Sequence, residues 1–258
     1  MKRVCVFLFS GTGMTRYIAR KLSSALEERQ AQVDVFEIEK PQSREVPVQG
    51  YDIIGIAYPV HSLNAPKKVV DFVKGLPETE RKEAFVISTA GGDSKLNSAS
   101  RDLPIGILRK KGFLPYYEKE FLMPSNFIVK DDVKAVEEKL EKAGLEIPKA
   151  ADDILDGVAN KGKAGFLAKL ASFAGRAEWL GTKLVRLHAD SKCDGCGLCA
   201  ARCPNQNIRV EAGAAAFNRN CGLCMRCLYL CPKHAARIRF PLRFFAFGEW
   251  YDNDGLRL

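Results

Sequence analysis

Eight of the nine cysteines of this 258-residue chain lie between residues 193 and 231. They form two runs of the type CxxCxxCxxxCP, and every cysteine of the first run recurs 28 residues later in the second. The first run is Cys193, Cys196, Cys199 and Cys203, and the second is Cys221, Cys224, Cys227 and Cys231. Such crowding argues against a disulfide scaffold and for thiolate metal ligation in a reducing compartment. The repeat indicates an internal duplication of a small metal-binding unit.

The spacing within each run is that of iron–sulfur ligation. Three thiolates at two-residue gaps converge on one cube, and the fourth, which precedes a proline, reaches the cube of the other run. One [4Fe-4S] cluster is then held by Cys193, Cys196, Cys199 and Cys231, and the other by Cys221, Cys224, Cys227 and Cys203. Zinc is the competing metal, but zinc sites rarely demand this fourfold spacing twice over. Residues 189–240 resemble the bacterial two-cluster ferredoxins.

A second candidate site lies near the N-terminus, where SGTGMT at 10–15 follows an apolar run and opens a helical pattern. A helix start offers free N–H groups and a positive dipole end, so this loop predicts a phosphate site. It lacks the lysine of a P-loop and the last glycine of a dinucleotide fingerprint. The string resembles the FMN phosphate loop of flavodoxins. Its residues Ser10, Thr12, Gly13 and Thr15 match that pattern, while Met14 replaces the usual asparagine.

The resemblance to flavodoxins implies two further loops that flank the isoalloxazine ring, after the third and fourth strands. AYPVHSLNAP at 57–66 and STAGGDS at 88–94 stand at these places. The candidate ring contacts are Tyr58, Pro59, Val60, His61 and Asn64 in the first loop and Thr89, Ala90, Gly91, Gly92 and Asp93 in the second. The second loop contains no aromatic residue, so we expect one flavin face to be more exposed.

These loops need a scaffold, and residues 1–160 have the pattern of one. Five apolar runs, each followed by a helical pattern except the second, predict an α/β doubly wound sheet of five parallel strands. The runs are RVCVFLF, QVDVFEI, YDIIGIAY, EAFVIST and FLPYYEKEFL. Cys5, in the first run, is expected to be a small buried hydrophobe. After residue 189 the alternation stops, and a small α+β ferredoxin-like domain is expected.

The segment 161–188 joins the two parts and carries six Lys and Arg against one Glu. Its apolar residues step by four and three, which predicts one helix with an apolar stripe. The stripe comprises Phe166, Leu170, Phe173, Ala177, Leu180, Leu184 and Leu187, edged by Lys169, Arg176 and Lys183. Three interpretations stay open: an interdomain strut, a dimer seam and a membrane-surface anchor. In the tail 241–258, five aromatic residues are expected to shield a cluster or to mark a partner site.

The net charge of +9 lies entirely outside residues 1–160, which carry 24 basic and 24 acidic residues. This asymmetry resembles that of a nucleic-acid-binding protein. Each oxidised cluster with four thiolates, however, contributes a charge of about −2, which brings residues 189–240 from +5 to about +1. We therefore interpret Arg202, Arg226 and Lys233 as electrostatic partners of clusters and expect no nucleic-acid partner.

The order of a flavodoxin-like part, a linker and a two-cluster part resembles the flavodoxin–ferredoxin fusion proteins, which occur mainly in anaerobes. The resemblance implies an electron-transfer flavoprotein with one FMN and two [4Fe-4S] clusters, coupling one- and two-electron carriers. The alternatives are a flavin-dependent reductase of a quinone or cobalt-containing cofactor, and a redox sensor. The electron partner is either a protein or a small molecule. No signal peptide or membrane span is predicted, so a cytoplasmic location is expected.

Overall fold

The computed structural model describes residues 1–92, 95–125, 131–176 and 186–239. The described residues divide into two compact units, one of residues 1–92, 95–124 and 132–175, the other chiefly of residues 176 and 186–239. Within the described ranges, no helix is long and apolar enough to cross a membrane. The aromatic tail lies outside the described residues.

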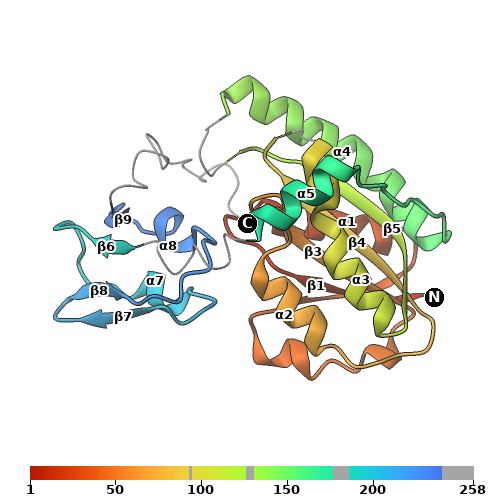
Figure 1. Ribbon diagram of the computed structural model, residues 1–258, viewed down its shortest axis with the longest axis horizontal. Helices are drawn as coiled ribbons and strands as arrows, with labels where there is room; N and C mark the ends of the chain where they lie inside the picture. The colour runs from red at the N-terminus through yellow and green to blue at the C-terminus, as the bar shows by residue number, and fades with distance from the viewer. Residues whose placement is uncertain (93–94, 126–130, 177–185, 240–258) are drawn as a thin grey trace. The chain divides into compact units, whose positions relative to one another are not determined.

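The first unit contains the predicted sheet of five parallel strands, in the order β2-β1-β3-β4-β5 (Figure 1). The strands are β1 (Arg3–Leu8), β2 (Gln32–Glu37), β3 (Ile53–Pro59), β4 (Lys82–Ala90) and β5 (Phe113–Leu122). This is the strand order of the flavodoxin-like fold. The central strands read as continuous apolar runs because helices cover both of their faces. The predicted fold class is therefore confirmed, and Cys5 is fully buried within β1.

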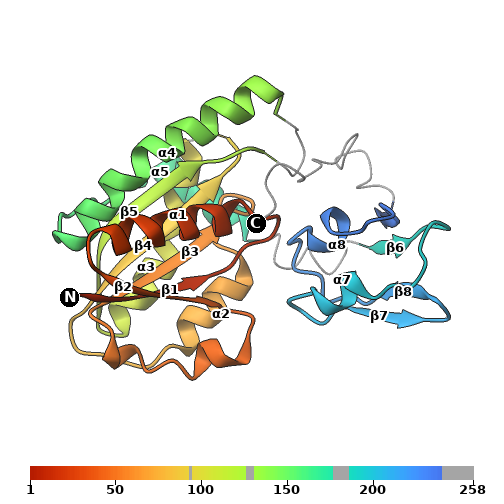
Figure 2. The same ribbon diagram turned by 180° about the vertical axis from the view of Figure 1, so that it is seen from behind.

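Helices α1 (Met14–Glu28) and α4 (Val133–Leu155) pack against each other on one face of the sheet (Figure 2). The opposite face is covered by α2 (Lys67–Gly75), the 3-10 helix η3 (Lys95–Arg101), α3 (Asp102–Lys110) and α5 (Phe166–Gly175) (Figure 1). Between β2 and β3 the chain forms only two short 3-10 helices, η1 (Pro41–Arg44) and η2 (Val48–Gly50), which agrees with the missing helical pattern there.

The linker differs from its prediction. After α4 the chain pairs with β5 at Asn160, and only Phe166–Gly175 is helical among the described residues of 161–188. Helix α5 docks on the first unit through Ala168 and Ser172, which are buried, while the predicted stripe faces solvent. Phe166, Leu170 and Phe173 are 80%, 56% and 69% exposed. Leu187 belongs to a strand, and Ala177, Leu180, Lys183 and Leu184 lie outside the described residues.

The described part of the second unit consists of short elements. Strands β6 (Leu187–Ala189) and β9 (Ala236–Ile238) pair antiparallel, as do β7 (Ile208–Glu211) and β8 (Ala214–Phe217). Two single-turn helices, α7 (Leu198–Ala201) and α8 (Arg226–Tyr229), complete this part. A small apolar core includes Ile208, Met225 and Leu228.

The 28-residue duplication is visible in the backbone of the second unit. Helices α7 and α8 occupy equivalent positions, and each starts after a residue in the left-handed region, Gly197 (φ 76°) or Met225 (φ 62°). The same equivalence relates Gly195 to Leu223 and Gln206 to His234, all with positive φ. Because non-glycine residues rarely adopt this conformation, its recurrence at matched positions confirms that the two runs form one repeated structure.

Candidate functional site

Three loops meet at one edge of the sheet because β1, β3 and β4 are adjacent and parallel. The loop at 10–13 follows β1, the loop at 60–66 follows β3, and residues 91 and 92 follow β4. The carboxyl ends of neighbouring parallel strands are where α/β sheets of this kind bind ligands. The three predicted flavin loops are thus brought together.

The loop at 10–15 has the features of a phosphate site. Gly13 precedes the 15-residue helix α1, whose first turn contains no acidic residue. Ser10 is buried, and its hydroxyl accepts a hydrogen bond from the Arg16 amide at 3.2 Å. Free N–H groups and the helix dipole at this end favour an anion. Met14, which replaces the asparagine of the flavodoxin pattern, is 8% exposed.

Thr89 connects this loop to the two others. Its hydroxyl shares a buried hydrogen bond of 2.8 Å with the hydroxyl of Thr15, and its carbonyl accepts from the Val60 amide at 2.8 Å. The carbonyl of Gly91 accepts from Lys139 of α4 at 2.7 Å, and that of Gly92 accepts from Asn97 at 3.1 Å. The candidate phosphate loop and both candidate ring loops therefore form one hydrogen-bonded assembly.

Two predicted ring contacts point elsewhere. The Tyr58 side chain is fully buried, and its hydroxyl donates to the Ser100 carbonyl at 3.4 Å, so its ring lies in the interior of the first unit and its contact with flavin stays a prediction. Asn64 is 2% exposed, and its amide group bonds to Ser172 of α5 instead of facing the crevice. The side-chain partners of these residues are distant in sequence, which is why local pattern did not reveal them.

The remaining described loop candidates differ in their exposure. Pro59, Val60 and His61 are partly exposed. The part of the His61 side chain that is buried is desolvated, which lowers its pKa to about 4, so its imidazole is neutral at pH 7. Ala90 is buried, and its carbonyl accepts from the Met123 amide at 2.9 Å. Asp93 lies outside the described residues.

A buried ionic cluster on the face covered by α3 was missed by sequence reasoning. Arg101 lies 3.5 Å from the carboxylate of Glu118 and 3.4 Å from that of Glu120, and it donates to the Ser88 hydroxyl at 2.9 Å. Burial raises the pKa of Glu118, against the opposing effect of Arg101. The cluster ties β4 and β5 to the start of α3. The alternating charges of YYEKEF were a signal that this strand is not wholly apolar.

In the second unit, the cysteines are free thiols that group across the two repeats. Cys199 lies close enough to interact electrostatically with Cys231 and Cys193. The thiol of Cys221 interacts with those of Cys224 and Cys203, and that of Cys227 interacts with the same set and also with Cys199. Cys203 thus lies near Cys221 and Cys227 of the second run, and Cys231 lies near Cys199 of the first. Cys196 is exposed.

Backbone amides point at the sulfur atoms. The Asn207 amide donates to Cys203 and the Ala235 amide to Cys231, both at 3.2 Å, and these donors are again 28 residues apart. Cys193 accepts from Ala215 and Cys221 from Leu223, both at 3.4 Å. Hydrogen bonds of this kind favour the thiolate form that metals require and tune the potential of a bound cluster.

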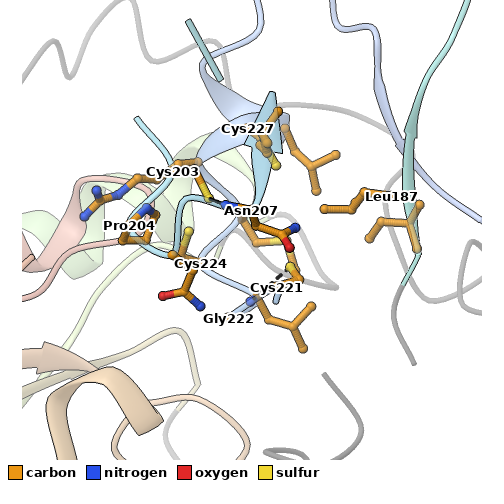
Figure 3. A pocket seen from close by; sticks show the side chains of 15 residues that line it. Leu187, Cys203, Pro204, Asn207, Cys221, Gly222, Cys224 and Cys227 are labelled. Carbon is orange, nitrogen blue, oxygen red and sulfur yellow. Dashed lines mark hydrogen bonds between the residues drawn. The ribbon is translucent and has the colours of Figure 1, made fainter. Parts of the chain in front are cut away.

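The set of Cys203, Cys221, Cys224 and Cys227 gathers around one pocket, which Leu187, Ile208, Leu228 and Ile238 also line (Figure 3). Burial raises the pKa of Cys221 to about 11. Arg226 is buried beside this pocket and donates to the Arg202 carbonyl at 3.4 Å, whereas Arg202 and Lys233 are exposed. A buried cation next to four thiols fits the donor set of an anionic cluster. Within the described residues, no group of three or more His, Cys, Asp or Glu side chains is placed to hold a metal ion.

No family model matches this chain. Among curated proteins, it is 33% identical over 107 residues to the DNA-directed RNA polymerase subunit Rpo3 of Methanosarcina mazei. That match covers 40% of this chain and 39% of the subunit. The chain therefore spans about two fifths of the length of this curated relative.

Several solved structures resemble the first part of the chain. A flavodoxin from Streptococcus pneumonia TIGR4 is 17% identical, with a TM-score of 0.41, and covers 60% of this chain and 98% of its own. The two-electron reduced flavodoxin of Megasphaera elsdenii is 18% identical, with a TM-score of 0.41, and covers 58% of this chain and 98% of its own. An FMN-dependent NADH-azoreductase from Bacillus anthracis is 13% identical, with a TM-score of 0.41, and covers 62% of this chain and 100% of its own. At these identities the likeness concerns the fold alone.

Proposed function

We propose that this chain is an electron-transfer flavoprotein that holds FMN at the three loops of the first unit and two [4Fe-4S] clusters at the two cysteine sets of the second. The observation that carries the proposal is the grouping of the thiols. Cys231 lies near Cys199 of the other repeat, Cys203 lies near Cys227 of the other repeat, and both Cys203 and Cys231 accept a hydrogen bond from a backbone N–H. FMN, when bound, supplies one- and two-electron chemistry, whereas each cluster transfers one electron at a time.

The chain's own residues have separate tasks in this proposal. The N-terminus of α1, with Ser10, Thr12 and Thr15, binds the phosphate, and the loops at 60–66 and 91–92 exclude water from the ring. Thr89 keeps the ring loops and the phosphate loop in register through its two hydrogen bonds. In the second unit, the thiolates ligate iron, and the buried Arg226 offsets part of the negative charge.

The phosphate role of Thr12 supplies the first test. Thr12→Ala is expected to raise the dissociation constant of FMN about tenfold, because a hydrogen bond to a charged phosphate is worth roughly 1.5 kcal/mol. Binding of riboflavin, which lacks the phosphate, should stay unchanged. Fluorescence titration of the full-length apoprotein measures both constants, with the exposed Ser24→Ala as control. Equal losses for both ligands would remove the assigned role.

The reaction class is tested with the reconstituted protein under anaerobic conditions. After chemical reduction, flavin and cluster absorbance are followed while candidate oxidants are added one at a time. Reoxidation by another redox protein alone supports the electron carrier. Turnover of a quinone or a cobalt-containing cofactor supports the reductase instead. A reconstituted protein without flavin would contradict the proposal for the first unit.

A further inference from the structure

The loop after β3 contains a tight turn in an unfavourable conformation. His61 and Asn64 form a two-residue antiparallel bridge, with the amide of each donating to the carbonyl of the other at 2.8 Å. The two residues between them, Ser62 and Leu63, have φ values of 43° and 64°. Two consecutive positive φ angles define a turn that normally requires glycine or asparagine. A serine and a leucine in this conformation must be held there by contacts outside the turn.

Helix α5 supplies those contacts. The Ser172 hydroxyl donates to Asn64 Oδ1 at 2.6 Å, and Asn64 Nδ2 donates to the Ser172 carbonyl at 2.8 Å and to the Ser62 carbonyl at 3.1 Å. Asn64 and Ser172 are each 2% exposed, so water does not compete for these bonds. Asn64 and Ser172 are 108 residues apart in the chain. The turn is therefore fixed by an element that is remote in sequence.

The end of α5 also touches the turn directly. A Cβ atom at Gly175 would lie 2.3 Å from the Ser62 carbonyl oxygen and 2.9 Å from Asn64 Nδ2. Glycine is thus required for the close approach of helix and turn. Helix α5 packs in addition against η3, the element that directly follows the second candidate ring loop. One helix therefore contacts the loop after β3 and the segment behind the loop after β4.

We infer that α5 is a positioning element for the flavin ring. Asn64 and Ser172 hold the 61–64 turn in place against α5, and neither residue contacts the flavin. The inference rests on the proposed binding of FMN at this edge of the sheet. It assigns a positioning function to a helix that the sequence indicates only as part of a linker. The docked face of α5 is the one with the small residues Ala168 and Ser172.

The first experiment measures ligand binding by the full-length apoprotein. Ser172→Ala leaves Asn64 Oδ1 buried and without this donor, so the dissociation constants of FMN and riboflavin should both rise five- to tenfold. Equal factors are expected because the helix acts on the ring, whereas Thr12→Ala affects FMN alone. Ser24→Ala, the same substitution at an exposed position of α1, should change neither. Unchanged binding, or a loss confined to FMN, would overturn the inference.

The second experiment needs no flavin and separates this inference from the proposed function. Hydrogen exchange of the His61 and Asn64 amides should be about tenfold faster in Ser172→Ala than in wild type, while amides of β1 and β3 keep their rates. Gly175→Ala provides a second variant with the same expected pattern. Unchanged exchange at residues 61 and 64 would refute the role of α5, even if FMN binds. Wild-type protein that binds neither ligand would refute the proposed function and leave this exchange result standing.

Discussion

His61 begins the strained turn at the candidate ring site, and its imidazole is neutral near pH 7 because burial disfavours the charged form. A neutral imidazole can accept or donate a hydrogen bond without adding a charge beside a flavin. The same burial links this residue to folding, since a group whose pKa is lowered in the native state takes up its proton more readily in the unfolded state.

The stability of the protein should therefore depend on pH through His61. The folded pKa of about 4 lies below the reference value of 6.5, so the unfolded state binds more protons between these values. Unfolding free energy is expected to fall by about 1–2 kcal/mol between pH 7.5 and pH 5, and to level off below pH 4. Urea denaturation of wild type and His61→Gln at both pH values gives this difference. Equal pH dependence in both proteins would contradict the assignment.

At the scale of elements, apolar continuity predicted the strands, but local pattern did not reveal how α5 docks. Strands such as β3 are buried on both faces, so their sequence carries the signal directly. The apolar stripe of α5 did not predict its docked face, because the contact between α5 and the loop after β3 depends on small residues. Ser172 and Gly175 fit against Ser62 and Asn64, which are far away in sequence. Helix α4 continues through Pro148 to Leu155, although proline usually ends or kinks a helix.

The end of α1 offers a test at the same scale. Gln30 has a φ of 62° and donates to the Glu27 carbonyl at 2.8 Å, while Ala31 donates to Leu26 at 3.1 Å, as in a Schellman motif. Gln30→Gly removes the strain of a left-handed side chain and should raise the unfolding free energy by roughly 0.5–1 kcal/mol. Arg20→Gly, at an exposed position in the middle of α1, should lower it by about 1 kcal/mol. Thermal unfolding measures both changes, and a destabilised Gln30→Gly protein would contradict the motif.

At the scale of the whole molecule, two units with different chemistry share one chain. The cysteine spacing predicted that Cys231 lies near Cys199 and Cys203 near Cys227, because ligation to a cube restricts spacing much more than packing does. The asparagines that pin the segment between the repeats carried no such signal. Asn207 accepts from the Asn218 and Asn220 amides and donates to Cys203, contacts that only the folded chain reveals.

The crossed sets predict opposite effects of two matched substitutions. Cys203→Ala should damage the cluster held mainly by the second repeat, and Cys231→Ala the cluster held mainly by the first. Electron paramagnetic resonance of the reduced, reconstituted proteins, with iron quantification, distinguishes the two signals. Loss of the opposite cluster in each variant would overturn the crossed assignment. Cys5→Ala, in the buried strand β1 of the other unit, serves as the control and should retain both signals.

The exchange of the fourth cysteine between the two proposed cluster sets would have an evolutionary consequence. A duplication whose copies work independently can lose one copy and keep half of its function. Here deletion of either 28-residue repeat would leave one set with three cysteines and the other with a single cysteine. Because each repeat would supply cysteines to both proposed clusters, selection would not act on the two repeats separately. The two repeats are therefore expected to be inherited, and lost, only as a pair.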